Sequence, residues 1–227
     1  MIIGSGLIAN AFAPSFSDDP DIIIFASGVS NSQENRVEAF LREKQLLLEC
    51  LSLKKKIFYF STCSVHDPQL LDKPYAVHKI EMENLVAASP DYVIFRLPQV
   101  VGTTPNPNTL TNYLHKQILS GSHFQIWRHA KRNLIDVDDV ALIATHLHQT
   151  FNTNRQLVNI ACPFSLTIDQ IVSIFELVLG IKANYSLVDM GGDYQIDSGL
   201  ASEVAQRIGV SFDDTYIEKL IRKYYGK

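Results

Sequence analysis

A tyrosine and a lysine four residues apart, Tyr75 and Lys79, have the side chains and the spacing for proton transfer. Four residues span about one turn of a helix, so the phenol and the ammonium are expected on one face. A nearby ammonium favours the phenolate and lowers the pKa of a phenol that otherwise titrates at about 10. The alternative is an ordinary surface helix pair, because this spacing also occurs by chance. The surrounding elements must decide between the two.

Buried strands alternate with helices along the chain. Four apolar runs are too continuous for half-exposed strands and are typical of strands buried on both faces: 22–26, 57–61, 92–97 and 157–161. Helical spacing of apolar residues occurs in four segments: 35–53, 75–88, 110–120 and 137–149. This alternation predicts an α/β, Rossmann-like doubly wound parallel sheet, whose ligands bind at the carboxyl ends of the strands.

The pattern changes after Ala161, where helices predominate. Three are expected, over residues 167–179, 198–208 and 213–225, with Thr167 as N-cap of the first and Gly180 at its end. We therefore predict a nucleotide-binding domain over residues 1–161 and a small, mainly helical C-terminal substrate lobe over 162–227. Residues 102–132 are expected to contribute to the substrate side, with 105–108 forming a loop over the strand ends.

A glycine-rich loop opens the chain. Residues 4–9 read Gly-Ser-Gly-Leu-Ile-Ala, the G-x-G-x-x-A form of the dinucleotide fingerprint, and a helix over 7–12 is expected before Pro14. Small residues there let the backbone approach a pyrophosphate, although a tight turn without a ligand needs similar glycines. The fingerprint also requires an acidic residue after a second strand, but Asp21 leads straight into Ile22. The second and third strands of the sheet, and with them the adenosine-ribose site, are predicted to be missing.

Composition excludes several other classes. The formal charge of −4 provides no basic surface for nucleic acid, and the three cysteines have neither zinc-site spacing nor disulfide density. No run of 18 apolar residues occurs and the chain start lacks basic residues, so we expect no membrane span and a cytoplasmic location. His146 and His148 face different ways on a helix, which makes a metal site unexpected.

Several ordered segments resemble the extended short-chain dehydrogenase/reductase family, the NAD-dependent epimerase/dehydratase group that acts on nucleotide sugars. Residues 60–65 are similar to its catalytic strand end, and Tyr75 and Lys79 match its Tyr-x-x-x-Lys helix. Three further segments match in order: 96–102, 132–141, and 159–160 followed by 167–168. The resemblance runs from Gly4 to about Tyr225, which is nearly the whole chain.

The resemblance implies a role for each matching residue. Tyr75 would be the general acid or base, Lys79 would lower its pKa and hold the nicotinamide ribose, and Thr62 would hydrogen-bond the reacting oxygen. The residues that would bind NAD or NADP are Gly4, Ser5, Gly6, Leu7, Ile8, Ala26, Ser27, Gly28, Tyr75, Lys79, Leu97, Pro98 and Val100. Substrate would contact Ser64, Gln99, Arg132 and Asp136. Alternatives are a strand-capping role for Thr62 and a surface ion pair between Arg132 and Asp139.

Departures from the family pattern narrow the expected reaction. Cys63 and Ser64 stand where dehydratases carry the Asp-Glu that expels water, so a 4,6-dehydratase is disfavoured. The family's helix asparagine has no clear equivalent within 40–44. We expect an NAD(P)-dependent reductase or epimerase acting on a nucleotide-linked 4-keto sugar in surface polysaccharide synthesis. The alternatives are a degenerate, non-catalytic binder of a nucleotide or protein partner, and a homodimer whose second subunit completes the cofactor site.

Overall fold

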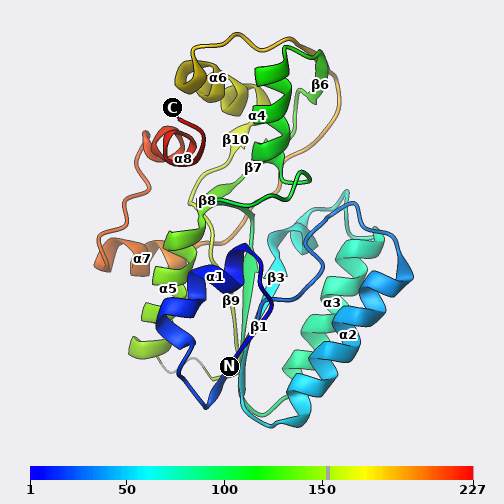
Figure 1. Cartoon of the computed structure of the whole chain (residues 1–227), viewed down its shortest axis with the longest axis vertical. Coiled ribbons are helices and arrows are strands. Elements are labelled where there is room, and N and C mark those ends of the chain that lie inside the picture. The colour runs from blue at the N-terminus through cyan, green and yellow to red at the C-terminus, as the bar shows by residue number, and fades with distance from the viewer. Residues whose placement is uncertain (152–153, 227) are drawn as a thin grey trace.

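A five-stranded parallel sheet forms the centre of the computed structural model, which describes residues 1–151 and 154–226. Its strand order is β1-β2-β3-β4-β9, and each neighbouring pair is parallel (Figure 1). The strands are β1 (Ile2–Ile3), β2 (Ile22–Phe25), β3 (Lys56–Thr62), β4 (Tyr92–Leu97) and β9 (Gln156–Asn159). The predicted α/β fold and its parallel sheet are confirmed.

Alternate residues of the central strands enter two different cores. On β2, Ile22 and Ile24 face one hydrophobic cluster, while Ile23 and Phe25 face another. The first cluster is covered by α1 (Leu7–Phe16) and α5 (Val137–Thr150), and the second by α2 (Val37–Ser52) and α3 (Pro74–Ala87). These helix pairs lie on opposite sides of the sheet in Figure 1. Burial on both faces explains why the strands read as continuous apolar runs.

The sheet ends at β1 in the described part of the chain. Five residues, 17–21, connect the end of α1 to the start of β2, which leaves no room for another strand, helix and strand. A full dinucleotide-binding sheet has two more strands between α1 and the strand here called β2. Their predicted absence is therefore confirmed. Helix α1 is longer than expected, because it continues through Pro14 to Phe16 instead of stopping at residue 12. Phe12 and Phe16, both buried, pack against the sheet and support this last turn.

A second layer of elements packs beyond the carboxyl ends of the strands. It contains α4 (Leu110–Ser120), β6 (Phe124–Trp127), α6 (Ile168–Leu179), β11 (Tyr185–Val188) and α8 (Tyr216–Tyr225), most of which lie at the top of Figure 1. Strand β11 was not expected from the sequence and pairs in parallel with β6. Short strands link the two regions: β5 (Gln99–Val101), β7 (Lys131–Arg132), β8 (Leu134–Asp136) and β10 (Leu166–Thr167).

The C-terminal segment is shared between the two regions. Helix α7 (Gly199–Arg207) packs Ala201, Val204 and Ala205 into the sheet-side cluster beside α5. Helix α8 packs Ile217, Leu220 and Ile221 into the hydrophobic cluster of the second layer. Residues 162–227 therefore do not pack as one separate unit.

No described helix is long and apolar enough to cross a membrane.

Candidate active site

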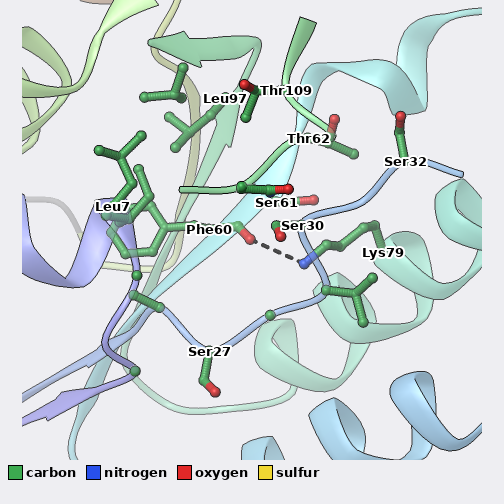
Figure 2. A pocket seen from close by; sticks show the side chains of 18 of the residues that line it. Leu7, Ser27, Ser30, Ser32, Phe60, Ser61, Thr62, Lys79, Leu97 and Thr109 are labelled. Carbon is green, nitrogen blue, oxygen red and sulfur yellow. Dashed lines mark hydrogen bonds between the residues drawn. The ribbon is translucent and has the colours of Figure 1, made fainter. Parts of the chain in front are cut away.

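A cavity of about 480 Å³ opens at the carboxyl ends of β1, β2, β3 and β4, where a doubly wound sheet places its ligands. The expected catalytic residue Thr62 and all of the expected cofactor-binding residues line it: Gly4, Ser5, Gly6, Leu7, Ile8, Ala26, Ser27, Gly28, Tyr75, Lys79, Leu97, Pro98 and Val100. Ser64 and Gln99 also line it, whereas Arg132 and Asp136 do not. Figure 2 shows several of these side chains around the cavity.

The glycine loop, residues 4–6, lines one side of the cavity. Gly4 has a φ of 125°, and a Cβ atom there would lie 2.4 Å from the Ala26 carbonyl oxygen. Gly6 is the N-cap of α1, and a Cβ atom there would meet open space. Gly6 and the first residues of α1 line the cavity, and a side chain at Gly6 would project into unfilled space. Free amides at a helix N-terminus favour an anionic group such as a pyrophosphate.

The two glycines predict different outcomes on substitution by alanine. Gly4→Ala is expected to lower the free energy of unfolding by about 1–3 kcal/mol, because it combines a strained φ with a backbone clash. Gly6→Ala is expected to lower it less, by about 0.5–1 kcal/mol, because Gly6 has an ordinary extended φ of −85° and alanine is only a poorer N-cap. Urea unfolding of both variants checks this, and equal losses of stability would contradict it.

Thr62 and Tyr75 meet at one side of the cavity. Thr62 is the last residue of β3, only 7 % exposed, and its hydroxyl accepts a hydrogen bond of 3.1 Å from the Ser64 amide. Tyr75 follows Pro74, the first residue of α3, and its phenol is hydrogen-bonded to Thr62. The hydroxyl and the phenol are thus placed to contact the same ligand oxygen.

Lys79 lies one turn further along α3 and is nearly fully buried. Its ammonium donates to the Glu43 carboxylate at 2.9 Å, to the Tyr59 hydroxyl at 3.1 Å and, at 3.5 Å, to the Phe60 carbonyl oxygen. Figure 2 shows the last of these bonds, at the edge of the cavity. The ammonium therefore reaches the cavity wall while it is paired with a carboxylate behind that wall.

Glu43, from the buried side of α2, is the centre of this arrangement. It is 0 % exposed and also accepts hydrogen bonds from the Tyr59 hydroxyl at 2.7 Å and the Val29 amide at 2.6 Å, while His78 Nε2 lies 3.0 Å away. Burial favours the neutral acid, but the hydrogen bond with His78 and the charge of Lys79 outweigh it. The pKa of Glu43 is held well below its usual range.

The electrostatics of Tyr75 differ from the sequence-based expectation. Burial and the negative charge of Glu43 raise the pKa of Tyr75 above its ordinary value, although the hydrogen bond with Thr62 partly offsets them. The net pKa of Tyr75 is therefore raised, whereas the sequence led us to expect that Lys79 would lower it. The physical reason is that the carboxylate bound to Lys79 opposes the effect of the ammonium.

The substrate side of the site is formed where the β3 end meets a segment of the upper layer. Ser64 lines the cavity and is hydrogen-bonded to Tyr194, which lies between β11 and α7. Burial, with a smaller contribution from Cys63, raises the pKa of Tyr194 to about 12, and the nearby Arg132 opposes the rise. Arg132 thus lies close to Tyr194 and does not line the cavity, and its guanidinium donates to the Lys131 carbonyl oxygen at 2.7 Å.

Asp136 lies outside the cavity. Its carboxylate caps α5 by accepting from the Asp138 amide at 2.9 Å, and it binds Lys223 and the Tyr224 hydroxyl, each at 2.7 Å. The structure thus places Asp136 in a structural cluster that joins α5 to α8, away from the expected substrate contacts. Asp139 belongs to the same cluster and accepts from the Tyr216 hydroxyl at 2.6 Å.

Polar residues that sequence reasoning missed complete the cavity. They come from the segment after β2, from helix α2 and from the loop before α4: Ser30, Ser32, Arg42, Thr104, Asn106, Asn108 and Thr109. Arg42 donates to the Ser27 carbonyl oxygen at 3.0 Å, and Asn112 donates to the carbonyl oxygens of Thr104 and Asn106. The signals were present in sequence, since the first segment is serine-rich and the second is a loop expected over the strand ends.

Comparison with known proteins agrees with this geometry. The model of the NAD dependent epimerase/dehydratase family matches residues 8–161, and the chain belongs to that family. This confirms the resemblance to extended short-chain dehydrogenases/reductases and the class of enzyme expected from it. No curated protein sequence matches significantly.

Solved structures share the fold at low identity. A UDP-glucuronic acid 4-epimerase from Bacillus cereus, in complex with UDP-glucuronic acid and NAD, has 21% identity and a TM-score of 0.72, covering 96% of this chain and 78% of that one. RMD from Pseudomonas aeruginosa, complexed with NADPH, has 14% identity and a TM-score of 0.69, covering 97% and 85%. A UDP-glucose 4-epimerase from Thermus thermophilus, in complex with NAD, has 15% identity and a TM-score of 0.67, covering 95% and 81%.

The cavity fits one end of such a dinucleotide better than the other. The open space at Gly6, at the start of α1, suits a pyrophosphate, and Lys79 and Leu97 line the same cavity. On the adenosine side, β1 is the sheet edge and the acid-bearing second strand is missing. Within residues 1–151 and 154–226, no cluster of three or more His, Cys, Asp or Glu is placed to hold a metal ion.

Proposed function

We propose that the protein is an NAD(P)-dependent reductase or epimerase acting on a nucleotide-linked 4-keto sugar. The observation that carries this proposal is that Thr62, Tyr75 and Lys79 line one cavity together with the amides of α1. When bound, the nicotinamide supplies or accepts the hydride. Tyr75 exchanges a proton with the sugar oxygen, and the Thr62 hydroxyl orients that oxygen by hydrogen bonding.

We assign the nucleotide part of the substrate to the side of the cavity that faces the second layer of elements. The Bacillus cereus neighbour is described with UDP-glucuronic acid, which supports a nucleotide sugar as the ligand class here. Ser64 and Gln99 line the cavity, and Arg132 places a positive charge near Tyr194, which is hydrogen-bonded to Ser64. A guanidinium is well suited to a diphosphate, so we propose these three residues as substrate contacts.

Cofactor titration tests the proposal directly. Isothermal titration calorimetry with NAD, NADH, NADP and NADPH is expected to give saturable binding, with affinities for NADH and NADPH within about tenfold. The reason is that the strand whose acid selects the ribose 2′-OH over a 2′-phosphate is missing. Gly6→Ala is expected to weaken binding of all four, because Gly6 lines the cavity at the start of α1 and its Cβ atom would occupy space that is open in this structure.

Two outcomes would redirect the proposal. Binding of none of the four nucleotides would favour the non-catalytic alternative, which the shortened sheet motivates. Binding that strengthens with protein concentration, in step with dimer formation measured by sedimentation, would support a second subunit that completes the site. Strong selection of NADH over NADPH would contradict the view that the protein binds the adenosine end of the dinucleotide only weakly.

A further inference from the structure

Glu43 introduces a negative charge directly behind the proton-transfer residues. It lies on α2, 36 residues from Lys79 in sequence, and their side chains are 0 % and 3 % exposed. Gly28 closes the remaining space, because a Cβ atom there would lie 2.6 Å from Lys79 Nζ and 2.9 Å from Glu43 Oε1. The pair is therefore enclosed, so solvent does not weaken the electrostatic interaction between the two charges.

The hydrogen-bonding capacity of Lys79 is already used within the protein. An ammonium has three donors, and Lys79 has three acceptors: Glu43, Tyr59 and the Phe60 carbonyl. The Tyr59 hydroxyl donates to Glu43 and so accepts from Lys79, which fixes the direction of both bonds. Any contact of Lys79 with a ligand must replace the longest of these, the 3.5 Å bond to Phe60.

The titratable and charged groups that face Tyr75 come from three elements. Helix α2 contributes Glu43 and strand β3 contributes Tyr59, while α3 contributes Lys79 and His78, both of which contact the Glu43 carboxylate. Of these, Glu43 carries a negative charge and Lys79 a positive one at a contact distance of 2.9 Å. Their effects on Tyr75 oppose each other, so the ammonium alone does not decide the state of the phenol.

We propose that Glu43 is a positioning residue that neutralises Lys79 and keeps Tyr75 as a phenol, so that the site donates a proton to a keto oxygen. The pairing of Glu43 with Lys79 stands on geometry, whereas the keto oxygen rests on the proposed function. In the reaction, a hydride from the reduced nicotinamide adds to the carbonyl carbon and the C=O electron pair moves to oxygen. Tyr75 gives its proton to that oxygen, and water reprotonates the phenolate.

At neutral pH this arrangement holds Tyr75 in the form that acts in the reduction step. An alkoxide is a strong enough base to take a proton from a phenol whose pKa is raised. Removing a proton from a sugar alcohol would instead require the phenolate, which burial and Glu43 disfavour.

The proposal is tested by titrating Tyr75 in the full-length protein without cofactor or substrate. Tyrosine labelled with 13C at Cζ reports ionisation by NMR, and Tyr75→Phe identifies the signal. In the wild type we expect a midpoint above 10. In Glu43→Gln we expect it to fall by about 1–3 units, because Lys79 then acts unopposed. Glu81→Gln is the matched control, since Glu81 lies on α3 in an exposed pair with Lys44, and it should leave the midpoint unchanged.

A second variant covers the case in which Glu43→Gln does not fold. Glu43→Gln/Lys79→Met removes both charges, a change that is often tolerated when both partners of a buried pair are replaced. Its Tyr75 midpoint should match the wild type, because the pair contributes no net charge. A midpoint raised by about one unit or more would show that Lys79 acts on Tyr75 in the wild type and would overturn the proposal. So would a wild-type midpoint below 10. Neither result depends on turnover. The titration can therefore fail while the proposed function holds, and the proposed function can fail while the titration succeeds.

Discussion

The Tyr75→Phe variant should turn over substrate about 10²–10⁴-fold more slowly than the wild type, while its cofactor affinity stays within about threefold. General acid catalysis by a positioned side chain contributes rate factors of this size. The substitution removes only the phenolic oxygen, which is hydrogen-bonded to Thr62 at the cavity wall. The ring remains, so the packing of the first turn of α3 is preserved.

The measurement is single-turnover oxidation of bound NADH or NADPH on addition of a UDP-linked 4-keto sugar, followed by nicotinamide absorbance. Tyr113→Phe provides the matched control, because Tyr113 is 39 % exposed on α4 and does not line the cavity. The control should turn over like the wild type. Unchanged turnover in Tyr75→Phe would remove Tyr75 from the mechanism and with it the proton-transfer part of the proposed function.

The parts of the fold that the sequence predicted correctly share a physical origin. Strands 22–25, 56–62 and 92–97 are buried on both faces, so their apolar residues form continuous runs that are hard to mistake. The shortened start was also predictable, because Asp21 leads directly into β2. Since parallel strands end at one edge of a sheet, the sequence also brought the glycine loop, Thr62 and Tyr75 to one cavity.

Long-range pairing limited the prediction of the site. Glu43 and Lys79 lie on different helices, and their contact depends on how α2 and α3 pack. One signal was available: Glu43 falls at helical spacing with Leu47 and Cys50 on the buried face of α2. A carboxylate at such a position requires buried partners, and the sequence could not identify them. Strand β11 was missed for a related reason, because its pairing with β6 joins segments about 60 residues apart.

Replacement of Asp136 by asparagine tests the reassignment of that residue from substrate binding to structure. Its carboxylate is 9 % exposed and accepts from Lys223, Tyr224 and the Asp138 amide. Asparagine keeps the size but loses the charge and one acceptor oxygen. Breaking a buried ion pair costs about 3–5 kcal/mol, and the 45 % exposure of Lys223 reduces the expected loss to about 2 kcal/mol.

Asp138→Asn is the matched control, because Asp138 binds the same Lys223 ammonium at 2.7 Å but is 58 % exposed. We expect the control to lose less than about 1 kcal/mol of unfolding free energy in urea. Below its unfolding transition, Asp136→Asn should bind UDP and the nicotinamide nucleotides as the wild type does. A variant with wild-type stability and no UDP binding would return Asp136 to the substrate site. Because α5 begins at Asp136 and α8 carries Lys223, the expected loss instead measures how strongly the C-terminal helix is tied to the helix beside the sheet.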